Sequence, residues 1–233
     1  MKPFMVTALL PMKANSQRVP GKNFKVLGGK PLYRWILDAL LSIDNVERVI
    51  INTDAAVLWN DSVLQNDERI ILRDREETLR GDAVSMNRIL ESDVASDTAD
   101  CFLMTHTTNP FLSVGTISRA LSEFENALAL GSADSLFSVN RFQTRFYRSD
   151  GSAINHDPEN LVQTQDLTPW YEENSCLYVF TREGFLATGA RIGRQPLMFE
   201  TPRLESIDID TPDDWALAEF VAPFFESVGQ ISK

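Results

Sequence analysis

Apolar and polar positions along the first 140 residues alternate between strand-like runs and helical spacing. Residues 4–10 and 46–53 are apolar runs of strand length. Between them, apolar side chains recur every three or four positions after Pro31, at Leu32, Trp35, Ile36, Ala39, Leu40 and Ile43. We expect further strands at 69–72, 101–105 and 134–140, and helices over about 55–65, 82–92 and 113–129. This order predicts an α/β fold with a mostly parallel sheet and helices on both faces.

The pattern changes in the second half of the chain. Residues 141–173 are polar, aromatic and rich in turn signals, and we interpret them as an inserted flap or hairpin. A strand is expected at 175–181, and a last helix at Thr211, a residue type suited to the N-cap. No internal repeat or low-complexity linker is evident, so we predict one domain over residues 1–233, with the insert at about 141–173.

The segment from Pro11 to Lys30 carries most of the candidate chemistry. It contains no acid and five cations, namely Lys13, Arg18, Lys22, Lys25 and Lys30. It follows the first predicted strand, where α/β folds bind ligands, and its glycines allow close backbone approach. We therefore expect a phosphate-bearing ligand, with a nucleotide as the first candidate. Solvated loop cations are the alternative, favoured for Lys25 and Lys30, and Arg18 could instead form a structural ion pair.

The overall charge makes this basic loop a local feature. The 233 residues have a formal net charge of −11 and are 43% hydrophobic. Broad nucleic-acid or anionic-membrane surfaces are basic, so we expect neither partner. Cys101 and Cys176 lie in apolar, strand-like contexts and are expected to be buried thiols. No apolar run reaches the length of a membrane helix, and we expect a cytoplasmic protein.

A second chemical signal lies at residues 205–210, which we expect to form a strand. Alternation there buries Ile207 and Ile209 and places Asp208 and Asp210 on one face. Two carboxylates at a strand end suit a hard divalent cation that also binds substrate phosphates. The competing interpretation is that one Asp supports the next helix N-terminus and the other is solvated.

These motifs resemble those of sugar-acid cytidylyltransferases, which include CMP-acylneuraminate synthetases and relatives acting on other nonulosonic acids. The similar segments are Leu10–Asn23, Leu27–Leu32, Asn52–Asp54, Leu72–Arg73, Arg80–Asp82, Thr107–Pro110, Gln165–Leu167, Asn174, Leu177–Tyr178 and Ser206–Asp210. The resemblance implies a Rossmann-like nucleotidyltransferase fold and a homodimer formed through the flap. It also implies a Mg²⁺-dependent reaction of CTP with a 2-keto-3-deoxy sugar acid, giving the CMP-sugar and pyrophosphate.

The resemblance assigns site residues. It implies that nucleotide contacts come from Pro11, Met12, Lys13, Asn15, Ser16, Arg18, Lys22, Asn23, Arg73, Asp82 and Ser85. Sugar contacts would come from His106, Thr107 and Asn174, with Arg141 and Arg145 on the flap as candidate cations for the substrate carboxylate. Asp208 and Asp210 would hold Mg²⁺, and Lys13, Lys22 and Asp210 would be catalytic. From the residues alone, Asp54 is equally suited to capping the next helix, His106 to a structural role and Asn174 to holding a turn.

Several positions depart from the family pattern. Lys13 stands where relatives usually have Arg, Thr164 and Glu172 stand where they often have Arg, and His106 replaces a Gln. These departures keep two alternatives open, a different base or sugar and a non-catalytic nucleotide-binding relative. A glycosyltransferase-like enzyme is disfavoured, because its Asp-X-Asp motif would lie mid-chain and not near residue 210.

Overall fold

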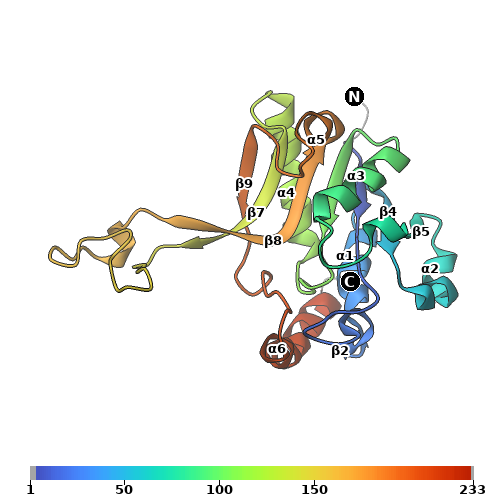
Figure 1. The fold of residues 1–233 in the computed structure, drawn as a ribbon, viewed down its shortest axis with the longest axis horizontal. Helices are drawn as coiled ribbons and strands as arrows, with labels where there is room; N and C mark the ends of the chain where they lie inside the picture. Colours follow the sequence, from blue (N-terminus) through green and yellow to red (C-terminus); the bar gives the residue numbers. More distant parts are fainter. Residues whose placement is uncertain (1–3, 232–233) are drawn as a thin grey trace.

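The computed structural model describes residues 4–231, and a seven-stranded sheet runs through the body of the molecule (Figure 1). The strand order is β5-β4-β1-β6-β8-β7-β9. The strands are β1 (Val6–Leu9), β4 (Val46–Thr53), β5 (Ile70–Asp74), β6 (Cys101–Thr105), β7 (Ser135–Phe142), β8 (Trp170–Thr181) and β9 (Pro196–Glu200). Only β8 runs antiparallel to its neighbours. The predicted mostly parallel α/β architecture is confirmed.

Helices cover both faces of this sheet. They are α1 (Leu32–Leu41), α2 (Ser62–Asn66), α3 (Met86–Ser96), α4 (Val114–Ala129), α5 (Arg182–Thr188) and α6 (Pro212–Ile231). Alternation along β1 explains the arrangement, because successive side chains point to opposite faces. Val6 and Ala8 join the core that contains α1 and α4, whereas Leu9 joins the core that contains α3 and α5. None of the described helices is long and apolar enough to cross a membrane.

Some predicted elements change in length or kind. The helix expected over 82–92 is α3, displaced to Met86–Ser96, and the one expected over 55–65 is a 3-10 turn (Ala56–Asn60) followed by α2. The strand expected at 205–210 is wrong, because this segment is irregular: Glu205 N and Ser206 N donate to the Pro202 carbonyl in a local turn, and Ile209 N donates to Thr108 O (2.9 Å). The sheet edge beside β7 is occupied by β9, which the sequence did not indicate.

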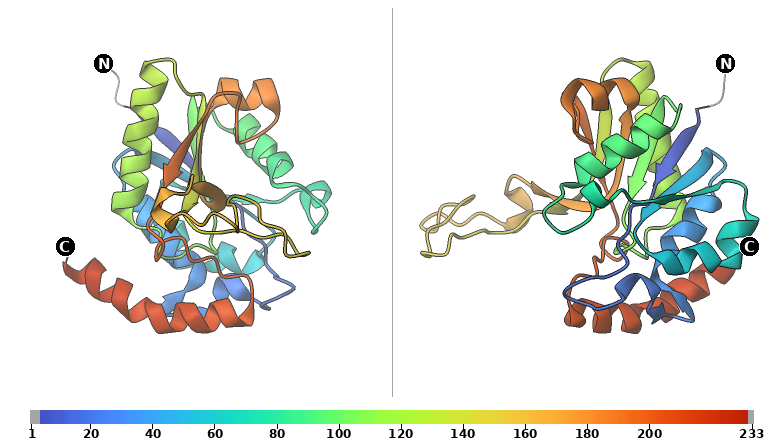
Figure 2. Two further views of the ribbon diagram at one scale, coloured as in Figure 1. Left: turned by 90° about the vertical axis from the view of Figure 1, so that its left-hand side faces the viewer. Right: turned by 45° about the vertical axis from the view of Figure 1, so that its right-hand side comes forward.

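Residues 143–169 form an arm that projects from the body between β7 and β8 (Figures 1 and 2). At its base the two strands stay paired, with Phe142 opposite Trp170. The Gln143 side-chain amide donates to the carbonyls of Gln165 (2.6 Å) and Leu167 (2.8 Å), which holds the two sides together. The arm occupies the segment for which the sequence predicts a flap.

The basic loop lies beyond β1 and packs on the C-terminal helix. A buried cluster joins Leu27 of the loop, Trp35 of α1, Ile209, and Trp215 of α6. The small hairpin of β2 (Val26–Leu27) and β3 (Lys30–Pro31) closes the loop before α1 begins. Ile209 is fully buried, so its flanking residues Asp208 and Asp210 are brought beside the loop. Both cysteines are buried and free, as predicted.

Candidate active site

A cleft of about 440 Å³ opens where the basic loop meets the carboxyl ends of β1 and β6. Its lining comprises Pro11, Met12, Lys13, Asn15, Ser16, Gln17, Arg18, Lys22, Asn23, Arg75, Asp82, Val84, Met86, Ile89, His106, Thr107, Thr108 and Asp210. Nine of the eleven predicted nucleotide-binding residues are in this set, and so are two of the five predicted sugar-binding residues. The fold therefore gathers most of the site predicted from sequence into one cavity.

Polar side chains fix the backbone of the loop. Asp54 accepts a hydrogen bond from the Ala14 amide (2.7 Å), so it anchors the loop and does not cap the helix that follows. Asn23 donates to the Lys13 carbonyl (2.7 Å) and accepts from the Thr107 hydroxyl (2.7 Å). Because Asn23 and Thr107 are both buried, these hydrogen bonds fix the backbone of Lys13 at the cleft.

The cations of the loop are paired with acids across the cleft. Lys22, with only 7% of its side chain exposed, donates to the Ile209 carbonyl and lies 3.2 Å from Asp210 Oδ1. Arg18 Nη1 lies 3.0 Å from Asp210 Oδ2. Lys13 Nζ lies 2.6 Å from Asp82 Oδ1, and this contact holds the pKa of Asp82 below its usual range. Three cations thus surround one cavity, which suits a polyanionic ligand.

Asp210 lines the cleft, whereas Asp208 lies outside its lining but close enough to Asp210 and Lys22 to interact with their charges, and neither carboxylate caps the next helix. That role belongs to Thr211 and Asp214, whose side chains bond the backbone at the start of α6: Asp214 accepts from the Thr211 amide (2.7 Å) and Thr211 Oγ1 accepts from the Asp214 amide (3.2 Å). Surrounding protein atoms raise the pKa of the Asp208 carboxyl, and the neighbouring Asp210 charge raises it further. A bound cation would relieve this like-charge repulsion, so the donor set fits a hard divalent ion.

No larger acidic or histidine cluster competes for that ion. Within residues 4–231, no group of three or more His, Cys, Asp or Glu side chains is arranged to hold a metal. The two carboxylates would therefore share the cation with water and substrate oxygens, which is the coordination that Mg²⁺ favours.

His106 lies half-buried at the end of β6, against the cleft. Burial lowers its pKa to about 4, and the positive charge of Arg191 contributes to the lowering. The imidazole is therefore neutral near pH 7, so His106 offers one hydrogen-bond donor and one acceptor and no charge.

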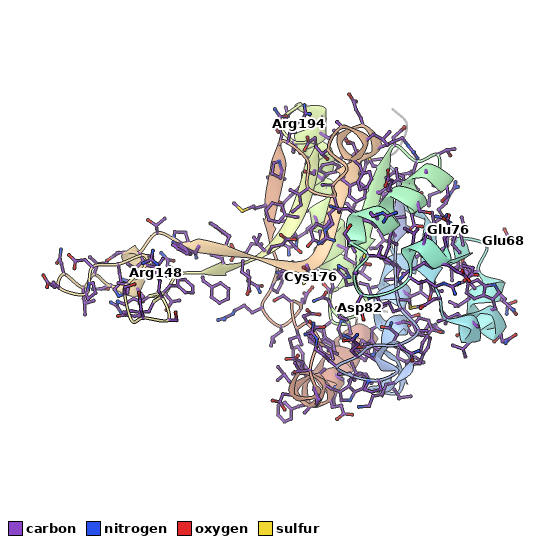
Figure 3. All side chains as sticks on the ribbon, viewed as in Figure 1. Glu68, Glu76, Asp82, Arg148, Cys176 and Arg194 are labelled. Atoms are coloured by element: carbon purple, nitrogen blue, oxygen red, sulfur yellow. The ribbon has the colours of Figure 1, made fainter. Side chains whose placement is uncertain are left out.

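Asn174, Arg141 and Arg145, all predicted to bind sugar, do not line the cleft. Asn174 is buried between strands, where it donates to Asn140 Oδ1 (3.0 Å) and Thr201 Oγ1 (2.6 Å). Arg141 lies at the base of the arm, where it donates to Gln143 Oε1 (2.7 Å), and Arg145 donates to the Val162 carbonyl (2.7 Å) within the arm. Figure 3 shows how far the arm, marked by Arg148, projects from the body that carries Asp82. Within one protomer, these three residues serve the arm and its base.

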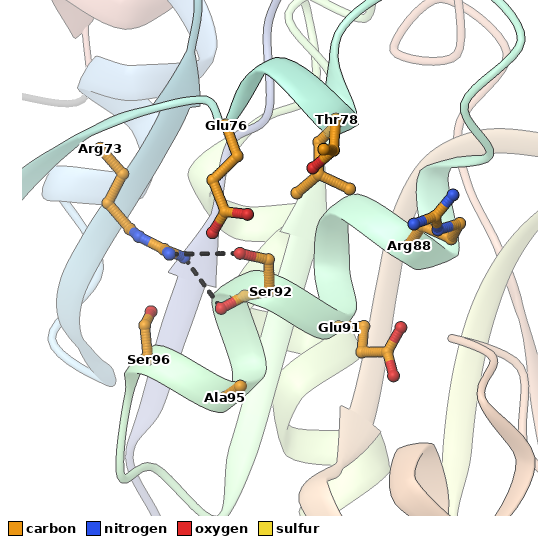
Figure 4. Close-up of a pocket in the computed structure, with 9 residues that line it drawn as sticks. Arg73, Glu76, Thr78, Arg88, Glu91, Ser92, Ala95 and Ser96 are labelled. Carbon is orange, nitrogen blue, oxygen red and sulfur yellow. Dashed lines mark hydrogen bonds between the residues drawn. The ribbon is translucent and has the colours of Figure 1, made fainter.

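Arg73 and Ser85 also lie outside the cleft. Arg73 lines a separate cavity of about 490 Å³ beside α3 and donates to the Ser92 carbonyl (3.0 Å; Figure 4). Arg75 lines the cleft instead, and its buried guanidinium bonds Asn52 Oδ1 (2.9 Å) and the Met12 carbonyl (3.2 Å). The strand predicted at 69–72 ends before both arginines, so the sequence did not distinguish them; in the structure Arg75 follows the carboxyl end of β5, whereas Arg73 lies within the strand.

Other cleft residues were not predicted. Gln17 shares Asp82 with Lys13, and Val84, Met86 and Ile89 supply an apolar wall. Ser85 precedes α3 and lines a smaller neighbouring cavity. An apolar wall of this kind suits a base or sugar ring, and the cations of the cleft suit a phosphate.

A cation-lined cleft at the carboxyl ends of parallel strands defines the class of nucleotide-binding α/β proteins. A family model described as Cytidylyltransferase matches residues 7–216. The chain belongs to the cytidylyltransferase family, as its motifs predict.

Named relatives agree with this assignment. The chain is 28% identical to the CMP-N,N'-diacetyllegionaminic acid synthase of Legionella pneumophila, over 92% of this chain and 94% of that protein. It is 27% identical to the N-acylneuraminate cytidylyltransferase of Oncorhynchus mykiss, over 92% of this chain but 49% of that protein, so it spans about half the length of the latter relative. A solved CMP:2-keto-3-deoxy-manno-octonic acid synthetase complexed with CTP shares the fold, with a TM-score of 0.65, 14% identity, and coverage of 96% of this chain and 99% of that one.

Proposed function

We propose that this protein is a CMP-sugar synthetase that transfers the CMP group of CTP to a 2-keto-3-deoxy sugar acid of the nonulosonic type. One observation carries the proposal: Lys13, Arg18 and Lys22 converge on a single cleft that the carboxylate of Asp210 also lines, with Asp208 close by. Similarity to a legionaminic acid synthase over nearly the full length of both proteins supports the choice of acceptor class.

The reaction joins the anomeric oxygen of the acid to the α-phosphorus of CTP. The bond from the α-phosphorus to the bridging oxygen breaks, and pyrophosphate leaves. In this proposal Lys13, Arg18 and Lys22 bind the triphosphate and balance the negative charge of the leaving group. The cleft fixes the two substrates in line, which supplies much of the rate enhancement.

Asp208 and Asp210 would hold Mg²⁺, which neutralises phosphate charge and orients the reacting groups when bound. In this account a free Asp208 oxygen takes the proton of the attacking hydroxyl. The neutral His106 would donate or accept a hydrogen bond at the acceptor without changing the charge of the site.

The proposal includes a homodimer formed through the arm and a cytoplasmic location. Exposed apolar side chains gather along the arm and its base, at Tyr147, Leu161, Val162, Trp170 and Tyr171. Surfaces with this many exposed large apolar residues favour protein contacts. Docking of the arm on a second protomer would also carry Arg141 and Arg145 toward the partner's cleft.

Thermal unfolding with each nucleotide tests the proposed function. CTP with Mg²⁺ should stabilise the protein selectively over ATP, GTP and UTP, because a ligand that binds only the folded state raises the melting temperature. Selective stabilisation by another nucleotide would refute the base assignment. The absence of stabilisation by any nucleotide would contradict the enzyme proposal and favour a non-catalytic relative.

A further inference from the structure

A smaller cavity of about 350 Å³ adjoins the nucleotide cleft. Its lining is Ser85, Met86, Asn87, Glu173, Ala190, Arg191 and Ile192. Met86 belongs to the linings of both cavities, so a ligand that extends from the cleft past this side chain enters the smaller cavity. The walls combine hydroxyl and amide groups with apolar side chains, one cation (Arg191) and one acid (Glu173), so the cavity can take a polar, substituted ligand.

Contacts with Tyr178 fix the Arg191 side chain in this cavity and leave some of its N–H groups without a hydrogen-bond partner in the described chain. Its guanidinium carbon lies 4.1 Å from the centre of the Tyr178 ring, and its Nη2 donates to the Tyr178 hydroxyl (3.1 Å). Stacking on an aromatic face leaves the N–H groups at the edge of the guanidinium free to bind. Nε and Nη1 have no hydrogen-bond partner among residues 4–231, and 20% of the side chain is exposed.

The neighbouring carboxylate of Glu173 does not use all the hydrogen-bond donors of Arg191. Glu173 lies 3.6 Å from Nη2, and the Tyr178 hydroxyl donates to the same carboxylate. Ser175 Oγ lies 3.1 Å from the Tyr178 hydroxyl oxygen, and Ser175 has φ 59°, the sole positive φ outside glycine in the described chain. Backbone in this region costs free energy for a residue with a side chain, and such strain concentrates at ligand sites.

The other cations of the site are engaged elsewhere. Lys13, Arg18 and Lys22 surround the cleft in which the triphosphate would lie. Arg75 is buried against Asn52 and Met12, and the arm cations lie outside both cavities. Arg191 is thus the cation that lines the smaller cavity, and its charge reaches the cleft, since it contributes to the lowered pKa of His106.

We propose that Arg191 binds the carboxylate of the sugar-acid substrate, in the cavity beside Ser85 and Asn87. This inference rests on the proposed function and names the residue that selects acids over neutral sugars. The unpartnered N–H groups of Nε and Nη1 donate to the substrate carboxylate, while the Tyr178 ring fixes the orientation of the guanidinium. An uncharged sugar would leave these donors unpaired in a partly buried site.

The test is calorimetric titration of N-acetylneuraminic acid into protein saturated with Mg²⁺ and a CTP analogue that carries a methylene bridge between the α- and β-phosphates. Arg191→Gln should weaken binding of the acid by about 10- to 100-fold and leave affinity for the analogue unchanged. Arg191→Lys, which keeps a positive charge, should bind the acid with intermediate affinity. The carboxamide derivative of the acid should bind wild type and Arg191→Gln equally.

Arg194→Gln is the matched control, because Arg194 is exposed, follows Arg191 by three residues and lies at the end of the body away from Asp82 (Figure 3). It should bind the acid like wild type. Binding by a folded Arg191→Gln within twofold of wild type would overturn the inference, as would wild type that binds no acid. Pyrophosphate release from CTP by wild type tests the proposed function separately. A protein that binds the acid through Arg191 without turnover would keep the inference and refute the transferase.

Discussion

Replacing Lys22 by Gln should weaken CTP binding more than it weakens the fold. The Lys22 ammonium is buried, where it donates to the Ile209 carbonyl and pairs with Asp210 at 3.2 Å. A charge-assisted contact of this kind contributes about 1.5–3 kcal/mol, so its loss toward phosphate should raise the dissociation constant of CTP by roughly 10- to 150-fold. The unpaired Ile209 carbonyl costs about 1–3 kcal/mol, and each kcal/mol lowers the melting temperature by roughly 2–4 °C in a protein of this size.

Calorimetric titration with CTP and Mg²⁺ measures the first effect, and thermal unfolding without ligand measures the second. Lys25→Gln is the control, because Lys25 lies in the same loop, is exposed and stacks over the Trp215 ring (3.9 Å) outside the cleft. It should bind CTP like wild type. A folded Lys22→Gln protein with wild-type affinity for CTP would refute this account of the basic loop.

Three further predictions follow from buried groups and from the arm. Burial raises the pKa of Asp93 from 3.8 to about 6, so the folded state holds this proton more tightly than the unfolded chain does. Asp93→Asn should therefore gain roughly 3 kcal/mol of unfolding free energy relative to wild type between pH 4 and pH 7, measured by urea denaturation, and a pH-independent difference would contradict this. The His106 ring protons should not titrate by NMR above pH 5, with His156→Gln used for assignment; a midpoint near 6.5 would show a solvated ring. Replacing residues 145–168 by a short turn should convert a dimer to a monomer in light scattering, and a dimer that survives would place the interface elsewhere.

The sequence predicted well those features that depend on residues adjacent along the chain. The apolar run at residues 4–10 identified β1, because a strand that is covered on both faces of a sheet is apolar at successive positions. The cationic loop was evident because five cations occur between Pro11 and Lys30 without any acid, in a chain that is acidic overall. Thr211 caps α6 as predicted, since capping involves only the first turn.

Features set by tertiary contacts were missed. Arg191 becomes a candidate substrate-binding residue only because its guanidinium stacks on the ring of Tyr178 in β8, and sequence spacing does not predict that contact. The segment at 205–210 alternates like a strand, yet it pairs with no strand of the described sheet, because Ile209 packs against Leu27 and Trp215 beside the basic loop. Arg73 and Arg75 differ by two residues, and only the end of β5 decides which one reaches the cleft.

Pyrophosphate release tests the central claim most directly. The purified protein is incubated with CTP, Mg²⁺ and a panel of nonulosonic acids, beside Asp208→Ala and Asp210→Ala proteins whose fold is verified by thermal unfolding. We expect wild type to release pyrophosphate and form a CMP-sugar with at least one acid, and both variants to lose at least 100-fold in rate, the order expected when a charge-stabilising contact at the reacting phosphate is removed. Wild-type release no faster than that of the variants would contradict the assignment of this cleft as a cytidylyltransferase active site.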